Sequence, residues 1–124
     1  MRTRLQVRTL MYHDVVAPGG WEMSGFPGPW SRHYKFTRGE FSEHLEAIGA
    51  VWPEMSVTAG DLTETDRVQL RLTFDDGGSG AMEAAELLEA RGWRGYFFVT
   101  TGRIDTPGFL SAEQIRLLAL RGHT

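Results

Sequence analysis

The sequence contains no cysteine and only one lysine, Lys35. Without cysteine the chain can form neither a disulfide nor a thiolate metal site, so any metal must be bound by Asp, Glu or His. Its 13 basic and 16 acidic residues give a formal net charge of -3, and no basic stripe is present. These features argue against nucleic acid as a partner.

Long apolar runs are also missing. No segment approaches the roughly 20 apolar residues of a membrane-spanning helix, so we expect no membrane span. Near the amino terminus, Arg4 and Arg8 interrupt the apolar residues, and no small-residue cleavage site follows. The chain as written therefore shows no secretory signal, and a cytoplasmic location is the default expectation.

What is present is the composition of one soluble domain. Of the 124 residues, 41% are hydrophobic and 23% are charged, which is ordinary for a globular protein with a modest core. No internal repeat or low-complexity tract divides the chain. We therefore place no domain boundary within residues 1–124.

Periodic apolar residues predict strands that alternate with helices. Strands are expected at 5–16, 68–74 and 95–100, the last as a buried apolar run. A long loop rich in Gly, Pro and aromatic residues follows the first strand at 17–34, and loops of this length are usually functional or disordered. Residues 51–66 predict turns with a short helix or strand.

Three helices are marked by residues at their ends. Thr37 with Glu40 and Ser111 with Gln114 form capping boxes, and Ser79 is placed to cap the middle helix. The expected stops are the glycines Gly49, Gly92 and Gly122. The order of strand and helix indicates an α/β fold with parallel strands and crossover helices.

The adjacent carboxylates Asp75 and Asp76 directly follow the second predicted strand. Active sites of parallel α/β folds form at such carboxyl ends. Two neighbouring carboxylates repel each other, and a bound cation relieves this cost. A simple turn or helix cap would also account for an isolated Asp-Asp-Gly.

The surrounding segments resemble the polysaccharide deacetylase family, also called the NodB-homology domain or carbohydrate esterase family 4. Thr73-Phe74-Asp75-Asp76-Gly77 is similar to its first signature motif, and Leu10-Met11-Tyr12-His13-Asp14-Val15 to its first strand. Gly95-Tyr96-Phe97-Phe98-Val99 resembles the Ala-Thr-Phe-Phe-Val strand of the family. These segments occur in the family's order across nearly the whole chain.

The resemblance implies a metal-dependent hydrolase that removes acetyl groups from a carbohydrate, with an acetylated carbohydrate as substrate. It implies that Asp75 is the general base and that Asp76 binds a divalent metal, usually zinc, with cobalt or nickel possible. The family's two other ligands come from an H-[ST]-x-x-H motif. Gly122-His123 matches a Gly-His that precedes this motif and is structural; the alternative is that His123-Thr124 begins the motif itself.

The resemblance also implies a partial (β/α) barrel of the NodB-homology type, truncated about half way, because a whole barrel needs roughly 200 residues or more. We therefore expect the chain as given to lack the metal His pair, to be inactive as an enzyme, and to self-associate through uncovered strands. His13 is expected to pack near the site. Trp21, Phe26 and Trp30 are expected either to stack on sugar rings or to cover the barrel end.

Two other functions remain open at this point. The first is a non-catalytic carbohydrate-binding module or a remnant fragment. The second is magnesium-dependent phosphoryl transfer, because acidic residues at a strand end also hold magnesium. That chemistry favours a spaced pair of aspartates or a Gly-rich loop with a lysine, whereas Asp75 and Asp76 are adjacent and the single lysine, Lys35, lies far away in the sequence.

Overall fold

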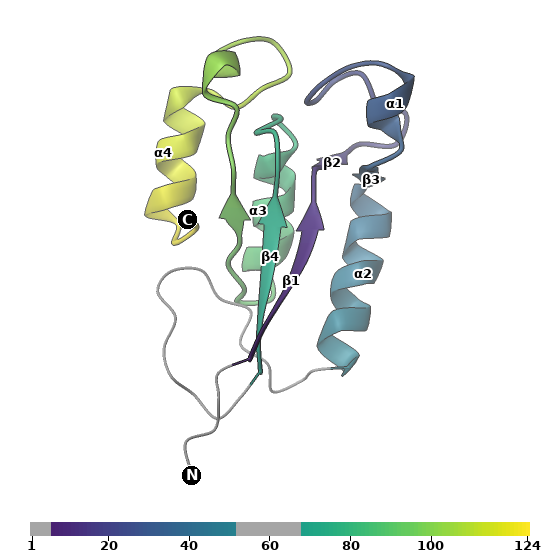
Figure 1. The fold of residues 1–124 in the computed structure, drawn as a ribbon, viewed down its shortest axis with the longest axis vertical. Coiled ribbons are helices and arrows are strands. Elements are labelled where there is room, and N and C mark those ends of the chain that lie inside the picture. Colours follow the sequence, from purple (N-terminus) through teal and green to yellow (C-terminus); the bar gives the residue numbers. More distant parts are fainter. Residues whose placement is uncertain (1–5, 52–67) are drawn as a thin grey trace.

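The computed structural model describes residues 6–51 and 68–124. Its main sheet has three parallel strands in the order β1-β4-β5, formed by β1 (Gln6–Tyr12), β4 (Val68–Phe74) and β5 (Tyr96–Phe97). Figure 1 shows β4 between its two neighbours. The parallel α/β arrangement predicted from the alternation of elements is confirmed.

A second, smaller sheet continues the chain beyond β1. It pairs β2 (Asp14–Val16) with β3 (Lys35–Thr37) in parallel. The long loop between them contains the short helix α1 (Pro29–Arg32). The loop is therefore ordered between two paired strands, which fixes where it leaves and where it returns.

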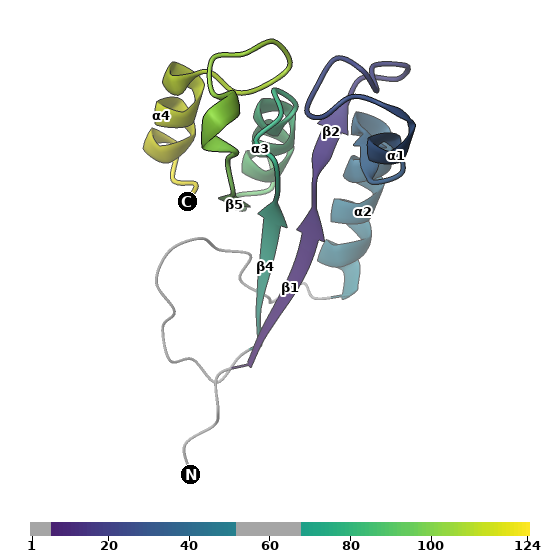
Figure 2. The same ribbon diagram turned by 45° about the horizontal axis from the view of Figure 1, so that its top comes forward.

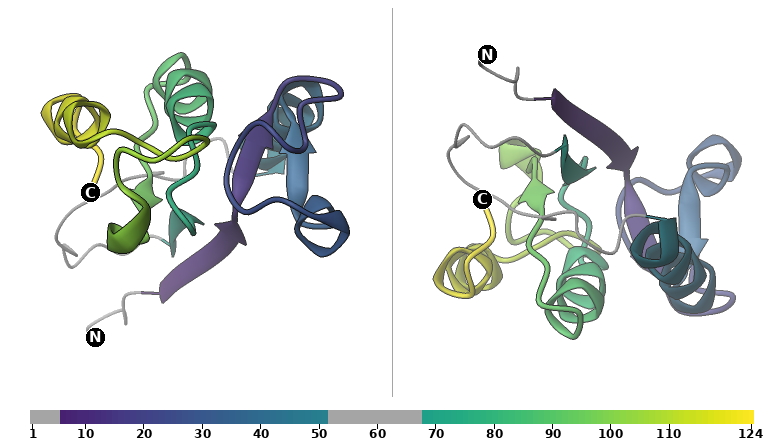
Figure 3. Two further views of the ribbon diagram at one scale, coloured as in Figure 1. Left: turned by 90° about the horizontal axis from the view of Figure 1, so that it is seen from above. Right: turned by 90° about the horizontal axis from the view of Figure 1, so that it is seen from below.

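Helices cover one face of the main sheet. Helix α2 (Arg38–Val51) and helix α3 (Ala81–Glu89) lie on the same side, as the views along the molecule show (Figure 3). Their buried residues pack against alternate residues of β4, and this core contains Phe41, Leu45, Leu70, Leu72, Phe74, Ala84 and Leu88. The period of two in β4 places Arg71 and Thr73 on the opposite face.

The last elements extend the sheet on the β5 side. A 3-10 helix, η1 (Thr101–Arg103), and helix α4 (Ala112–Leu120) follow β5. Thr124 then donates to the carbonyl of Gly95 and accepts from the N–H of Phe97, which is the hydrogen-bond pattern of a parallel neighbour. Within the described ranges, every helix is too short or too polar to span a bilayer.

Both capping boxes predicted from the sequence are present. The N–H of Glu40 donates to the Thr37 hydroxyl and the N–H of Thr37 to the Glu40 carboxylate, and Ser111 and Gln114 exchange the same two bonds. Each box satisfies backbone donors that the first helical turn leaves unpaired. Gly92 and Gly122 follow their helices with positive φ angles, as expected of stops.

Four local predictions are wrong. The strand expected at 5–16 is divided into β1 and β2, which belong to different sheets. Ser79 does not cap α3, because Gly80 is the N-cap and the Ser79 hydroxyl instead donates to the carbonyl of Met23. Gly49 does not end α2, which continues to Val51. Strand β5 is shorter and more exposed than predicted: it ends at Phe97, although the N–H of Phe98 still donates to the carbonyl of Phe74 and the N–H of Thr100 to that of Asp76. The turns predicted at 52–66 and the predicted strand start at residue 5 lie outside the described residues.

Candidate active site

Asp75 and Asp76 directly follow the carboxyl end of β4, the central strand, as predicted. The N–H of Asp75 donates to the carbonyl oxygen of Tyr12 at 2.9 Å, and the carbonyl of Asp76 accepts from Thr100 at 3.2 Å. Both aspartates are half-buried. The pair is thus held between the end of β1 and the segment after β5.

The backbone at this point turns sharply. Asp76 has a φ of 77° and Gly77 one of 73°, a conformation that is uncommon for a residue with a side chain. A Cβ atom on Gly77 would lie 2.9 Å from Cγ1 of Val99, so glycine is needed there for close approach as well as for its φ angle. A non-glycine residue held in the left-handed region often marks a functional site.

The aromatic loop lies at the same end of the sheet as this pair. Its Gly25 N–H donates to the carbonyl of Gly108 at 2.8 Å, and its Ser24 hydroxyl accepts from the N–H of Gly80 at 2.7 Å. In Figure 2 the loop and α1 lie beside the turn that follows β4. The prediction that the loop and Asp76 share one end of the sheet is confirmed.

The three aromatic residues of the loop have different surroundings. Phe26 packs edge-on against Phe109 with ring centroids 5.1 Å apart, so it covers this end of the sheet. The Arg32 guanidinium lies 5.0 Å from the Trp21 ring centroid. Trp30 is 83% exposed and is the most accessible of the three to a ligand.

His13 lies one residue beyond Tyr12, the β1 residue in register with Phe74. It is therefore level with Asp75 on the neighbouring strand. Its ring centroid lies 4.3 Å from that of Tyr34. This contact agrees with the expectation that His13 packs near the site.

His123 is a structural residue in the described fold. Its Nδ1 accepts from the N–H of Gly95 at 3.1 Å, which leaves Nε2 as the donor to a Glu89 carboxylate oxygen at 2.8 Å. Burial lowers the pKa of His123, against the opposing effect of Glu89. Neither ring nitrogen has a free lone pair, which agrees with the preferred reading of Gly122-His123 as a structural pair.

Asp14 is a buried carboxyl group beside the site that the sequence did not single out. It is 4% exposed at the start of β2. Burial raises its pKa, the neighbouring Ser24 hydroxyl and Lys35 ammonium oppose this, and the charge of Asp76 adds to the rise. The sequence signal that could have indicated its burial is an acidic residue, next to His13, within the mostly apolar segment from Tyr12 to Val16.

Lys35 is the second buried charge that the sequence did not single out. It is 5% exposed, and its Nζ donates to the carbonyl oxygens of Trp21, Ser24 and Phe26 at 2.6, 2.7 and 2.7 Å. Three short bonds to one loop satisfy all three donors of the ammonium group. Lys35 therefore fixes the shape of the aromatic loop.

No group of three or more His, Cys, Asp or Glu residues that could hold a metal occurs among residues 6–51 and 68–124. Asp76 alone therefore falls short of the three protein ligands of a catalytic zinc site.

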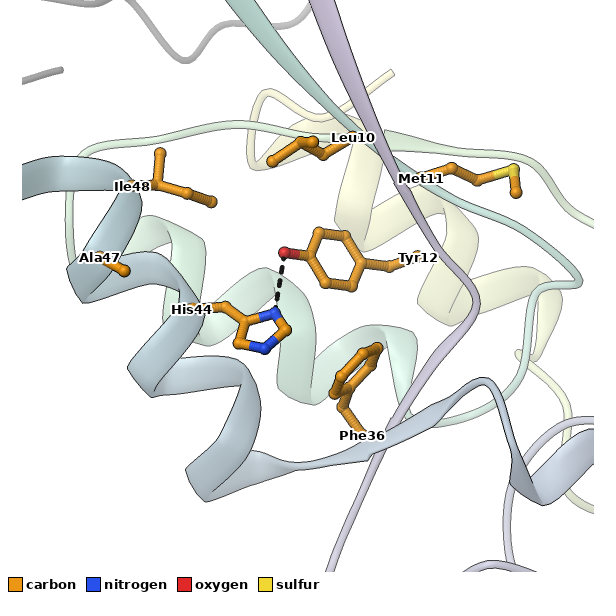
Figure 4. Close-up of a pocket in the computed structure, with 7 residues that line it drawn as sticks. All are labelled: Leu10, Met11, Tyr12, Phe36, His44, Ala47 and Ile48. Atoms are coloured by element: carbon orange, nitrogen blue, oxygen red, sulfur yellow. Dashed lines mark hydrogen bonds between the residues drawn. The ribbon is translucent and has the colours of Figure 1, made fainter. Parts of the chain in front are cut away.

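A separate apolar groove lies between β1 and α2, with a volume of about 450 Å³. Leu10, Phe36 and Ile48 line it, and the Tyr12 hydroxyl and His44 Nδ1 form a hydrogen bond of 3.2 Å within it (Figure 4). It contains neither Asp75 nor Asp76. The groove is therefore distinct from the candidate active site.

Neither a protein-family model nor a curated protein sequence matches the chain. Solved structures do. IcaB from Ammonifex degensii is 24% identical with a TM-score of 0.67, and the match covers 98% of this chain and 53% of that one. A de-N-acetylase from Aggregatibacter actinomycetemcomitans is 17% identical with a TM-score of 0.71, covering 95% and 52%.

BC0361, a polysaccharide deacetylase from Bacillus cereus, is 16% identical with a TM-score of 0.68, covering 96% of this chain and 37% of that one. The chain thus spans about half or less of the length of these structures. Its described elements form a partial barrel, as the sequence predicted. The chain has the fold of the amino-terminal part of a polysaccharide deacetylase, the NodB-homology barrel.

Proposed function

We propose that the chain supplies the catalytic base and one metal ligand of a metal-dependent hydrolase that removes acetyl groups from a carbohydrate. The observation that carries this proposal is the pair Asp75–Asp76, held at the carboxyl end of the central strand in a fold shared with polysaccharide deacetylases. Residues 1–124 are proposed to be one portion of that single domain.

Asp75 is the proposed general base. Its backbone is fixed by the hydrogen bond to Tyr12, and its half-buried carboxylate keeps access to solvent. In the reaction it takes a proton from the water whose oxygen attacks the acetyl carbon. That proton then passes to the leaving nitrogen or oxygen as its bond to the acetyl carbon breaks, so acetate is released together with a free amine from an N-acetyl group or an alcohol from an O-acetyl group.

Asp76 is the proposed metal ligand. A carboxylate suits zinc, and cobalt and nickel also accept such a donor. A divalent ion held here would polarise the acetyl carbonyl and lower the pKa of a water bound to it. The described residues supply this one donor at the site and no three-residue cluster, so they account for part of such a centre.

The substrate side of the proposal rests on Trp30. Its ring is 83% exposed at the end of the sheet that carries Asp76, on a loop that Lys35 holds in place. Sugar rings present apolar faces that stack on such side chains. An acetylated polysaccharide or oligosaccharide is therefore the proposed substrate class.

A test of this proposal is acetate release from N-acetylated chito-oligosaccharide and from acetylated xylan, measured with the protein in its longest natural form. Removing divalent metal with a chelator should abolish release, and adding zinc or cobalt should restore it. Metal-independent release, or none from any acetylated sugar while a phosphate ester is hydrolysed with magnesium, would contradict the proposal.

A non-catalytic carbohydrate-binding module is the second candidate. The exposed Trp30 favours it. It predicts saccharide binding that does not depend on acetylation or on a divalent metal. A comparison of acetylated with deacetylated chito-oligosaccharide distinguishes the two candidates.

A further inference from the structure

Asp14 has one carboxylate oxygen that lacks a hydrogen bond. Its Oδ1 accepts from the N–H of Val15 at 3.0 Å, whereas Oδ2 has no hydrogen-bond partner among the described residues. A buried carboxylate costs several kcal/mol unless its surroundings compensate. An unpaired buried oxygen of this kind calls for an explanation in its surroundings.

Two chain segments press their backbones against this carboxyl group. Gly25 belongs to the aromatic loop, whereas Gly78 and Gly80 follow Asp76. A Cβ atom on Gly25 or Gly78 would lie 2.8 or 2.7 Å from Oδ2 of Asp14, and one on Gly80 would overlap Oδ1. Asp14 is therefore the side chain on which loop and turn meet.

Ser24 and Lys35 complete this contact. The Ser24 hydroxyl accepts from the N–H of Gly80 at 2.7 Å, so it joins the loop directly to the turn. Lys35 binds the carbonyls of the same loop. It is also the register partner of Asp14 in the β2–β3 pair, and its charge favours the ionised Asp14 carboxyl. Two buried opposite charges at one junction limit the electrostatic cost of each.

We propose that Asp14 is a positioning residue that, together with Ser24 and Lys35, fixes the aromatic loop against the turn carrying Asp75 and Asp76. Within this turn, Asp76 has a positive φ angle. Gly78 and Gly80, which follow it, lie against the Asp14 carboxyl group. The carboxylates therefore keep their place relative to Trp30 through a buried contact that involves no substrate. The consequence of this contact for catalysis rests on the proposed function, whereas the contact itself does not.

The test uses amide hydrogen exchange and carboxyl ¹³C NMR signals of the 124-residue chain, in Asp14→Ala, Ser24→Ala and Asp14→Asn. In the two alanine variants, Gly25 and Gly80 should exchange about tenfold faster, whereas Leu45 and Leu118 keep their protection. Asn retains an oxygen for the N–H of Val15, so it should restore most of the protection. Glu46→Gln, on the exposed face of α2, is the matched control and should change nothing.

The ¹³C signals of the Asp75 and Asp76 carboxyl groups should move in Asp14→Ala and return toward wild type in Asp14→Asn. Both variants remove the charge, so the difference between them reports on position. Unchanged exchange at Gly25 and Gly80 would overturn the inference. Equal acceleration at Leu45 and Leu118 would also overturn it, because Asp14 would then support the whole fold. These readouts need neither metal nor substrate, so their failure is distinct from failure of the proposed function.

Discussion

The N–H of Asp75 donates a 2.9 Å hydrogen bond to the carbonyl oxygen of Tyr12. This bond extends the ladder between β1 and β4 by one residue and places a potential base at its end. Because Tyr12 is packed among Phe36, Phe41 and Phe74, the bond ties the position of Asp75 to the aromatic core.

Gly77→Ala should destabilise the chain. The substitution places a Cβ in the left-handed region and 2.9 Å from Val99, and we expect a loss of about 1–3 kcal/mol in the free energy of unfolding. The measurement is urea denaturation followed by circular dichroism. Gly39→Ala, in α2 with open space around it, is the control and should be neutral or stabilising by up to about 1 kcal/mol. Equal effects in the two variants would contradict the account.

Stability should fall as the pH drops below about 6.5, the ordinary pKa of histidine. The pKa of His123 is lowered in the fold, chiefly by burial, with Glu89 opposing and the charges of Arg94 and Arg121 adding to the decrease. The unfolded state therefore binds a proton first, and stability is lost as the pH falls from that value toward the folded pKa. Protonation would also break the bond that Gly95 donates to Nδ1.

The unfolding free energies of wild type and His123→Gln, compared between pH 7.5 and 5.5, isolate this effect. Their difference should shrink toward low pH, because the variant has no imidazole to protonate. A difference that stays constant over this range would show that His123 is not held in its neutral form.

Trp30→Ala should weaken binding of chito-oligosaccharide. Loss of one stacking ring is worth about 1 kcal/mol, so the dissociation constant should rise about fivefold in an NMR titration. Leu120→Ala, which removes another large exposed side chain on α4, is the control. Binding that is insensitive to Trp30 would remove the case for a sugar platform on the aromatic loop.

Self-association of the chain should depend on the β1 edge. Met11 is 63% exposed on β1, an outer strand of the three-stranded sheet, and exposed edges of this kind invite pairing. Met11→Lys should shift the chain toward monomer in sedimentation velocity. Met23→Lys introduces the same charge on the loop, at a side chain that is 75% exposed, and should not. A monomeric wild-type chain at high concentration would refute this expectation.

The sequence predicted those features that short segments determine. The capping boxes at Thr37 and Ser111 and the aspartate pair after β4 depend on neighbours within a few residues, and all three have the expected place. The proposed roles of Asp75 and Asp76 remain predictions.

The sequence could not predict features that distant segments create. The Ser79 hydroxyl donates to the carbonyl of Met23, which is 56 residues away in the chain, and so does not cap α3. The burial of Asp14 requires Gly25, Gly78 and Gly80 to lie against it. The apolar periodicity of a sequence does not indicate contacts between such distant residues. The burial that lowers the pKa of His123 likewise arises only in the folded chain, as do its bonds to Gly95 and Glu89, which are 28 and 34 residues away.

The most direct test separates the proposed roles of the two aspartates. In the longest natural form of the protein, bound zinc and the rate of acetate release are measured for Asp75→Asn and Asp76→Asn, with Glu46→Gln as control. The account predicts that Asp75→Asn keeps its zinc and loses at least about a hundredfold in kcat, whereas Asp76→Asn loses both. Near wild-type turnover in Asp75→Asn, or full zinc occupancy in Asp76→Asn, would contradict it.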